Sequence, residues 1–478
     1  MIARYKELMK NILLFAVNAV ATKLITFLLV PLYTSYMSAG EYGLTDMSIT
    51  VISLVTPLVT LDVSEAAVRY IVGDRKNSER YAAFAFGLTL ISICLVAALT
   101  PLLGLGIFGG LGDYKIWFVL TYATTAVMNL CCEVARGSGE VKLIPLCAGL
   151  SSVVTLVSAL VLIGNFDLGV SGYFLSVSIG PALAILVYLT VGGLGRMAVR
   201  GALKLSTGGF AAVREIAVPM VRYSLPLIPN ALFWWAGTSI NRFFITGMLG
   251  ISASGMFAAA GKVPNLLNTA YSVFQQAWQL SAFQEAKDEG VARFYSEVYR
   301  VLTAGMTVLC ALISLLAPLL GSVFLRGETY GAWPMIPVLL IANLMNVFNS
   351  FYGTVYTSTM HTAFIMRTTV FGALSCVVFT PLLIPLMGTY GACIASLIGQ
   401  GLVFVMRAMD SQKYIAFDAG WGSLLPTLFI LAVQSLAIAV QLPEWKLISL
   451  ACLVLVVILQ GRRLLPILGF VKSKVRRS

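Results

Sequence analysis

The chain is poor in the residues that most catalytic and metal centres use. Among 478 residues it has one histidine, His361, and 20 acidic residues, and only 11% of the chain is charged. The eight cysteines lie in or at the ends of apolar segments, with no CxxC pair and no cysteine–histidine cluster. We therefore expect no metal site, no disulfide framework and no cofactor. The cysteines are expected to pack as small apolar side chains.

What replaces charge is apolar surface. Hydrophobic residues make up 59% of the chain, and its mean hydropathy is +0.91. Soluble domains usually carry about 25% charged residues, so this composition predicts an all-α integral membrane protein. The first apolar stretch runs to about Val30 without a small-residue cleavage pattern. It is therefore interpreted as a retained membrane span rather than a signal peptide.

Apolar runs of about 20 residues, the length of one crossing, recur along the whole sequence. Their number, about 14, is even, which predicts that both termini lie on the same side of the membrane. The predicted spans lie near 11–33, 44–68, 81–105, 115–135, 143–164, 169–194, 222–248, 253–280, 298–323, 334–358, 364–386, 389–408, 422–441 and 445–465.

The net charge of +12 is distributed unevenly across these spans. Of 32 Lys and Arg residues, 26 lie in the termini and in the loops of one side, and three (Lys115, Arg326 and Lys446) lie on the other. Basic loops mark the cytoplasmic side, so both termini are predicted to be cytoplasmic and no nucleic-acid partner is expected. The opposite loops are short, which leaves no room for a catalytic domain there. We expect a protein that is not an enzyme.

Two pairs of similar segments indicate an internal duplication. "LGVSGYFLSVSIG" at 168–180 matches "MGTYGACIASLIG" at 387–399 with an offset of 219, and Gly43 aligns more weakly with Gly255 at an offset of 212. Parallel repeats of this kind are typical of alternating-access transporters. The predicted parts are an N-terminal six-helix bundle (1–194), a cytoplasmic amphipathic linker (195–217), a C-terminal six-helix bundle (218–410), and two additional helices with a basic cytoplasmic tail (411–478).

Three cations lie inside predicted spans, namely Lys23, Arg242 and Lys262. A charge at the centre of a bilayer helix costs roughly 2.5–3.5 kcal/mol on insertion scales, so we interpret the three as lining a cavity for an anionic substrate. Each also has a structural alternative. Lys23 could snorkel or pair with Asp46, and Arg242 could pair with a carbonyl exposed by the prolines of its span. Lys262, just before Pro264, could sit in a kinked and hydrated stretch.

Acids in the spans are the candidates for coupling transport to Na⁺ or H⁺. Asp46, Asp62 and Glu65 all fall in the second predicted span. A structural role is the alternative for each of them. The sequence leaves the energy source open.

Three segments of the sequence resemble a known family. "PLYTSYMSAGEYG" (31–43), "RYSLPLIPNALFWWAGTSINRFFI" (222–245) and "SGMFAAAGKVPNLLNTAYSVFQQAW" (254–278) are similar to the Wzx-type polysaccharide biosynthesis flippases of the multidrug/oligosaccharidyl-lipid/polysaccharide superfamily. The resemblance implies two pseudo-symmetric six-helix bundles in a V-shaped, MATE-like arrangement. It also implies that a polyprenyl-pyrophosphate-linked oligosaccharide is moved to the outer leaflet for lipopolysaccharide or exopolysaccharide synthesis. The expected setting is a bacterial or archaeal inner (plasma) membrane, with membrane lipids and polysaccharide polymerase machinery as partners.

The resemblance also bears on one pair of residues. The family's usual Asp-Arg corresponds to Asn241-Arg242 here. The arginine is kept and the acid is not, which argues against ion coupling at this position and adds Asn241 to the candidate substrate-binding residues.

Three other functions remain open. A peptidoglycan lipid-precursor flippase shares the pyrophosphate chemistry. A cation-coupled multidrug antiporter of the same fold would need acids rather than cations deep in its cavity. A membrane glycosyltransferase or polymerase would need acid, His or Arg groups in a sizeable outer loop, and such a loop is missing from the predicted topology.

Overall fold

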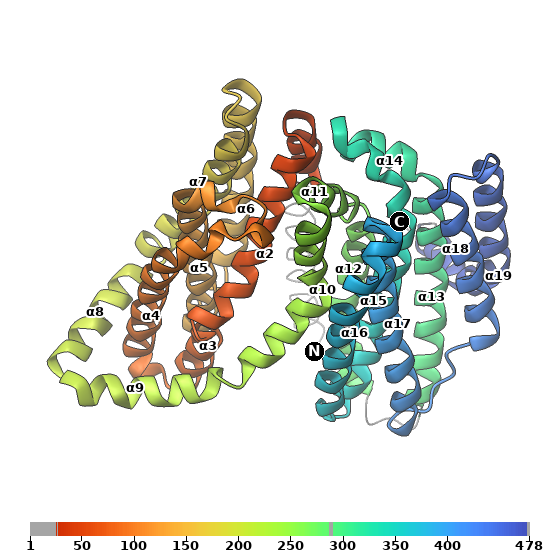
Figure 1. The fold of residues 1–478 in the computed structure, drawn as a ribbon. Coiled ribbons are helices and arrows are strands. Elements are labelled where there is room, and N and C mark those ends of the chain that lie inside the picture. The colour runs from red at the N-terminus through yellow and green to blue at the C-terminus, as the bar shows by residue number, and fades with distance from the viewer. Residues whose placement is uncertain (1–24, 26, 286–289, 476–478) are drawn as a thin grey trace. The chain divides into compact units, whose positions relative to one another are not determined.

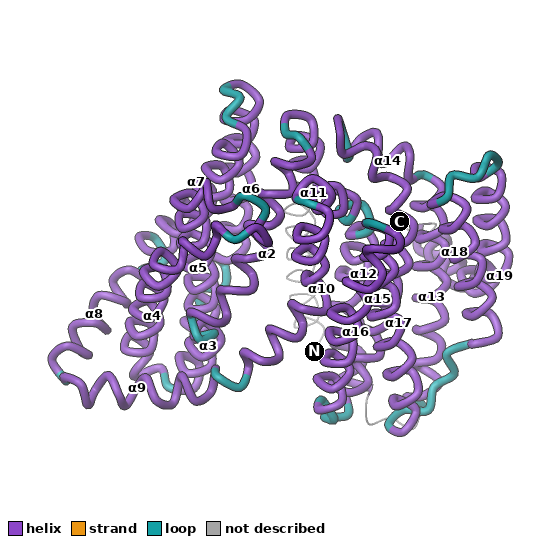
Figure 2. The backbone as a smooth tube through the Cα atoms, viewed as in Figure 1, coloured by secondary structure: helices purple, strands orange, loops and turns teal. Residues whose placement is uncertain are grey.

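The structure is a computed structural model that describes residues 25, 27–285 and 290–475, with the backbone alone for 462–475 and for several positions between 273 and 285. Every regular element in these residues is helical, and they contain no strand (Figure 2). Contacts divide the chain into two compact units. Unit 1 comprises Met1–Trp235 with Gly250–Gly255, and unit 2 comprises Ala236–Leu249 with Met256–Ser478.

Unit 1 is built from helices long enough to cross a membrane together with shorter ones. The helix Phe27–Tyr36 precedes them. They are α2 (Ala39–Val59), α3 (Val63–Gly73), α4 (Ser78–Leu99), α5 (Lys115–Ser138), α6 (Leu143–Ala159, continued by a π-helical turn, Leu160–Asn165), α7 (Gly169–Thr190), α8 (Leu194–Thr207) and α9 (Gly209–Ser224). α5 packs against α3, α4 and α7, which makes it the central helix of the unit.

Helix α2 begins at a capping box and ends at a break. The Ser38 hydroxyl accepts a hydrogen bond from the Glu41 main-chain N–H (3.2 Å), and the Glu41 carboxylate accepts one from the Ser38 N–H (2.9 Å), which satisfies two amides that have no partner inside the helix. At the other end Leu61 and Asp62 both have φ of 51°, a conformation that costs an L-residue roughly 1–2 kcal/mol. The predicted span 44–68 is therefore two helices, α2 and α3.

Two glycines of unit 1 allow main chains to touch. A Cβ on Gly255, in α11 (Ile251–Ala260), would lie 1.9 Å from the Ala39 carbonyl oxygen, and a Cβ on Gly43 would lie 2.3 Å from the Ile251 carbonyl oxygen. Only glycine fits such an approach of α2 to the first turns of α11. These two glycines are the pair that the weaker repeat alignment equates. The duplication itself stays a prediction.

The predicted linker 195–217 forms two helices that pack against α3 and α4. Figure 1 shows α9 running past the ends of α3 and α4 and α8 slanting beside α4, and contacts join α8 to α4 and α9 to α3. A Cβ on Gly201 would lie 1.8 Å from the Glu79 carbonyl oxygen, so α8 meets α4 backbone to backbone. Lys204 also binds the Glu79 carboxylate at 2.6 Å.

Unit 2 contains the second half of α10 (Leu227–Leu249), the second half of α11 and the helices that follow. The following helices are α12 (Asn265–Glu285), α13 (Val291–Leu315), α14 (Ala317–Phe324), α15 (Ile336–Ser358), α16 (Ala363–Met387), α17 (Thr389–Asp410), α18 (Trp421–Ala439) and α19 (Trp445–Val475). Helix α15 is its core: it contacts α12, α13, α17 and α18, and its side chains are buried along most of its length.

Helices α18 and α19, the two additional helices of the prediction, are joined to unit 2 by amide hydrogen bonds. The Gln434 amide donates to the Ala311 carbonyl of α13 at 3.0 Å and to the Ser449 hydroxyl of α19 at 2.7 Å. Gln460 donates to the Thr427 hydroxyl of α18 at 2.8 Å. Such bonds link helices where apolar contact alone gives little preference for protein over lipid.

Eleven helices of the described residues are long and apolar enough to cross a membrane, and two shorter apolar helices, Phe27–Tyr36 and Trp445–Gly461, accompany them. The all-helical membrane fold is therefore confirmed, whereas the predicted number of 14 is not. Most of the first predicted span lies outside the described residues. The predicted span 253–280 is divided between α11 and α12.

Candidate functional site

Arg242 is half-buried in the second half of α10. Its guanidinium donates to the Thr238 carbonyl one turn earlier, at 3.4 Å. This carbonyl is not one that a proline of the span exposes, so the structural alternative for Arg242 stays a prediction. The bond is longer than the roughly 2.7–2.9 Å of a charge-assisted bond to an anion.

Lys262 lies where a membrane helix is interrupted. Helix α11 ends at Ala260, α12 begins at Asn265, and the turn between them carries Lys262, half-buried, two residues before Pro264. Proline lacks an N–H and so favours the break. The first turn of α12 is the positive end of a helix dipole. A lysine beside it concentrates positive charge in the turn, which favours an anion there.

Asn241 is occupied by helix packing. It is 3% exposed, and its amide donates to the Ser396 hydroxyl at 2.6 Å while its carbonyl oxygen accepts from the Thr380 hydroxyl at 2.6 Å. These bonds tie α10 to α16 and α17 within unit 2. We therefore leave Asn241 out of the substrate site proposed below. Lys23, the remaining predicted cation, lies outside the described residues.

Two of the three candidate coupling acids, Asp62 and Glu65, lie close enough for their charges to interact, and the third, Asp46, lies on α2. Asp46 is half-buried on α2, Asp62 is half-buried in the break before α3, and Glu65 is exposed in the first turn of α3, where the helix dipole favours an acid. Among the described residues no group of three or more His, Cys, Asp or Glu side chains could hold a metal ion. The acids are thus not gathered into one multidentate ion site.

A set of amide side chains in unit 2 was not singled out from the sequence. The Asn268 amide on α12 donates to the Asn343 carbonyl oxygen on α15 at 2.6 Å and to Asn265 at 3.3 Å. Asn343, Asn346 and Ser350 are all half-buried, and their spacing puts them on one helix face. That spacing is the signal that could have found them, because polar residues repeated on one face of an apolar helix mark a surface turned away from lipid.

Arg407, at the end of the predicted span 389–408, is one of the 26 basic residues that the sequence assigned to the termini and loops of the cytoplasmic side, and the structure shows that it is buried. It is 8% exposed in the last turn of α17. Its guanidinium donates to the Asn349 carbonyl at 2.9 Å and the Thr368 hydroxyl at 2.9 Å, with longer bonds to Ile365 and Thr369 at 3.4 Å. All four acceptors are neutral oxygens of α15 and α16, so this arginine has a structural role.

The fold is shared with solved membrane transporters. A structure titled "Lipid II flippase MurJ, inward closed conformation" matches with a TM-score of 0.69 at 11% identity, over 94% of this chain and 98% of that one. An inward-facing multidrug resistance MATE family transporter of the MOP superfamily matches with 0.66 at 16% identity, over 84% and 98%. A MOP superfamily transporter from Pyrococcus furiosus, whose title describes a reversed polarity of its binding pocket, matches with 0.56 at 15% identity, over 85% and 95%. The class defined by this fold is a multi-pass, all-helical membrane protein.

The family is narrower than the fold. A sequence model of the family described as "Polysaccharide biosynthesis protein" matches residues 8–279, more than half of the chain. The chain therefore belongs to the polysaccharide biosynthesis protein family, as the resemblance implied. No curated protein sequence matches it significantly.

Proposed function

We propose that this protein is a flippase that moves a polyprenyl-pyrophosphate-linked oligosaccharide from the cytoplasmic to the outer leaflet for cell-surface polysaccharide synthesis. Its membership of the polysaccharide biosynthesis family carries this proposal, and the multi-pass fold supports it. Transport of this kind breaks and forms no covalent bond, so the protein acts as a transporter rather than an enzyme. Polysaccharide polymerase machinery would take up the product on the outer face.

The pyrophosphate is the part of such a substrate that is hardest to take across. Arg242 in α10 and Lys262 in the α11–α12 turn offer it two half-buried cations in unit 2, and Lys23 is a third cation in the predicted first span. Hydrogen bonds between charged partners are roughly twice as strong as neutral ones, so these cations offset part of the desolvation of the phosphates. Broken helices with such termini are typical of substrate sites in transporters.

The sugars need neutral donors and acceptors. Asn268 and Asn343 form one hydrogen-bonded amide pair between α12 and α15, and Asn346 continues the row along α15. An amide group both donates and accepts, as a sugar hydroxyl does. We assign this half-buried row to the oligosaccharide, while the polyprenyl tail stays in lipid.

Ion coupling is a separate hypothesis. If Na⁺ or H⁺ drives transport, Asp46 on α2 and Asp62 in the α2–α3 break are the acids we assign to it, with Glu65 as the exposed third candidate. Because the described residues contain no group of three or more His, Cys, Asp or Glu side chains that could hold a metal ion, a proton is the better fit: it needs one carboxylate, whereas a sodium ion needs several oxygen ligands. Asp46→Asn would then abolish the dependence of transport on a proton gradient.

A peptidoglycan lipid precursor is the second candidate substrate, because it presents the same pyrophosphate to the same cations. A cationic drug is a poorer candidate, since Arg242 and Lys262 would repel it. The experiment below separates these three substrates by the lipid, or the drug sensitivity, that changes when the protein is removed.

The test uses cells without this protein in which the later polymerisation steps are intact. Their lipids are extracted and assayed for a polyprenyl-pyrophosphate oligosaccharide that reagents added outside do not reach. We expect this lipid to accumulate on the inner face, and the wild-type gene to relieve the accumulation. Arg242→Ala should cut the transport rate about tenfold or more, the value of a lost contact to a charged group.

Two variants control for charge and for expression. Arg242→Lys keeps the charge and should retain part of the transport. Arg293→Ala removes an exposed cation that pairs with Glu297 at 3.0 Å and should leave the rate unchanged. Normal transport by Arg242→Ala and Lys23→Ala at native expression would overturn the cation assignment. Normal lipid pools together with altered sensitivity to cationic drugs would overturn the flippase.

A further inference from the structure

The outer face of α8 combines exposed apolar and basic side chains. Val199 and Leu203 are each 61% exposed, and Arg196 and Arg200 are exposed as well. We name these four residues the linker face. A soluble surface rarely leaves two such apolar side chains open beside two arginines, whereas a helix lying in the interface of a membrane does so regularly.

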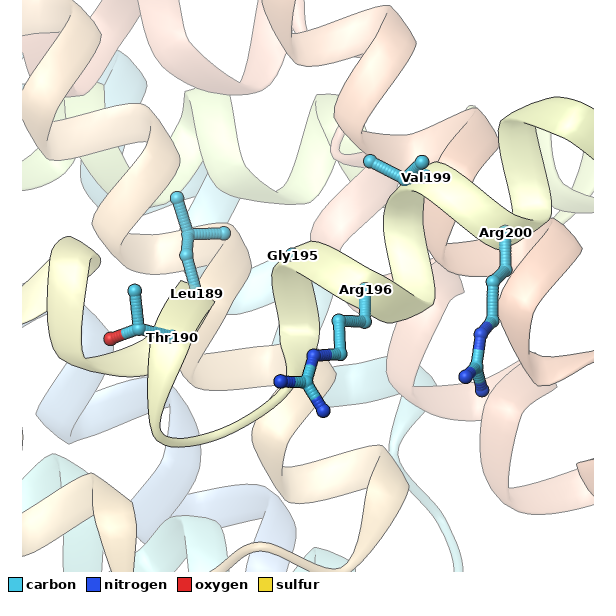
Figure 3. A pocket seen from close by; sticks show the side chains of 6 residues that line it. All are labelled: Leu189, Thr190, Gly195, Arg196, Val199 and Arg200. Carbon is cyan, nitrogen blue, oxygen red and sulfur yellow. The ribbon is translucent and has the colours of Figure 1, made fainter.

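The linker face follows from helical spacing. At about 100° per residue, Leu194, Gly201 and Leu205 fall on one side of α8, and they are the residues buried against the unit. The linker face lies opposite, with Val199 and Leu203 on one edge and the two arginines on the next. Figure 3 shows Arg196 and Arg200 extending together on the side of α8 away from Val199.

A hollow of about 540 Å³ opens beside this face. Arg196, Val199 and Arg200 line it from α8, and Leu189 and Thr190 line it from the end of α7 (Figure 3). Its size is in the range of small-ligand sites, roughly 300–1,000 Å³. Because α7 is one of the helices able to span a membrane, the hollow lies at the end of a membrane span, the level at which lipid headgroups are found.

The charge around the hollow is positive. Lys204 binds the Glu79 carboxylate at 2.6 Å, and Arg200 approaches the same carboxylate at 3.8 Å. In the part of the chain that the structure describes, no ion pair is recorded for Arg196. Two cations thus share one carboxylate, and Arg196 adds a further positive charge to the lining of the hollow.

The same pattern continues on α9. Phe210 is 83% exposed and Val218 53% exposed, and with Arg214 and Glu215 they border a second hollow, of about 530 Å³. Positions 210, 214 and 218 are spaced by four residues and so share one helix face. Glu215 pairs with Arg80 at 3.6 Å. Both α8 and α9 therefore carry exposed apolar side chains beside an exposed arginine.

We propose that the linker face binds the headgroup of an anionic phosphoglyceride, with the phosphodiester on Arg196 and Arg200 and the acyl chains against Val199 and Leu203. A free phosphate or nucleotide would use the arginines but not the exposed apolar edge. A lipid uses both, and it is supplied by the leaflet into which α7 inserts. The bound lipid would hold α8 on the membrane surface, a role that does not depend on what the protein transports.

The purified full-length chain in detergent is titrated with phosphatidylglycerol and, separately, with phosphatidylcholine, and native mass spectrometry counts the lipids bound. Phosphatidylglycerol should bind more tightly. Arg196→Gln/Arg200→Gln should weaken its tightest site on the order of tenfold or more, given the attraction of each basic residue for anionic lipid. Val199→Ser/Leu203→Ser, which keeps every charge, should weaken it severalfold.

The matched control is Arg75→Gln/Lys76→Gln, which removes the same charge from an exposed turn of the same unit. Equal losses in the control and in the arginine pair would overturn the site in favour of diffuse attraction. Displacement of phosphatidylglycerol by an equal concentration of glycerol 3-phosphate would overturn the lipid in favour of a simple anion site. Variants are compared at matched thermal unfolding midpoints. If the arginine pair does not fold, an unchanged affinity in Val199→Ser/Leu203→Ser overturns the proposal by itself.

Discussion

The contact of α2 with α11 gives a prediction whose size can be worked out. Changing Gly255 to alanine puts a Cβ 1.9 Å from the Ala39 carbonyl oxygen. Carbon and oxygen normally meet at about 3.3 Å or more, so the two helices must separate by about 1.4 Å at this point. Because both partners in the clash are fixed parts of helices, a side-chain rotation cannot relieve it.

The cost follows from overpacking. Forced shifts of this kind cost about 1–3 kcal/mol, while replacing a helical glycine by alanine returns roughly 0.5–1 kcal/mol. Gly87, in α4, is the matched control, because a Cβ there meets nothing within 4 Å. Gly87→Ala should therefore gain the same helix-propensity free energy without a steric clash. The difference in free energy of unfolding between the two variants isolates the steric cost, at about 1–3 kcal/mol.

The assay is unfolding of the purified chain in mixed micelles by increasing SDS, followed by the loss of helical circular dichroism. We expect Gly255→Ala to unfold at a lower SDS fraction than the wild type and Gly87→Ala at the same or a higher one. If the two variants unfold together, the backbone contact between α2 and α11 does not contribute to stability, and the reasoning is wrong.

Two further predictions use the same assay. Arg407→Lys keeps the charge but cannot reach oxygens on two helices at once, so it should lose about 1–3 kcal/mol, whereas an unchanged midpoint would mean that the bond to the Asn349 carbonyl is unimportant. Asn241→Leu should lose a similar amount by leaving the buried Thr380 hydroxyl without its partner, and Asn241→Asp should lose more because it buries a charge. Stability equal to the wild type in Asn241→Leu would reopen a substrate role for this residue.

Hydropathy alone predicts which stretches of this chain are membrane helices, because a span must be apolar along its whole length. It does not predict where a span breaks. Pro264 predicts the break after α11. The break between α2 and α3 falls at Leu61 and Asp62, where neither residue is a glycine or a proline. Their left-handed backbone depends on packing that a local pattern does not contain.

The candidate site shows the same limit. The sequence identified Arg242 and Lys262 because charge is rare in apolar helices, and both are half-buried in the structure. It could not tell Asn241 from its neighbour Arg242, because adjacent residues point about 100° apart on a helix and only the packing of α16 and α17 decides which one is covered. Arg407 was missed for a related reason, since a basic residue at the end of a span resembles a headgroup anchor.

The partners of Arg407 also bear on how the protein is assembled. Its acceptors belong to α15 and α16, which precede α17 in the chain and so enter the membrane first. The arginine therefore emerges from the ribosome after the oxygens that will hold it, and α17 can insert against a prepared surface. In a protein with these helices in the reverse order, the guanidinium would stay without hydrogen-bond acceptors in the bilayer until α15 and α16 had been synthesised and inserted.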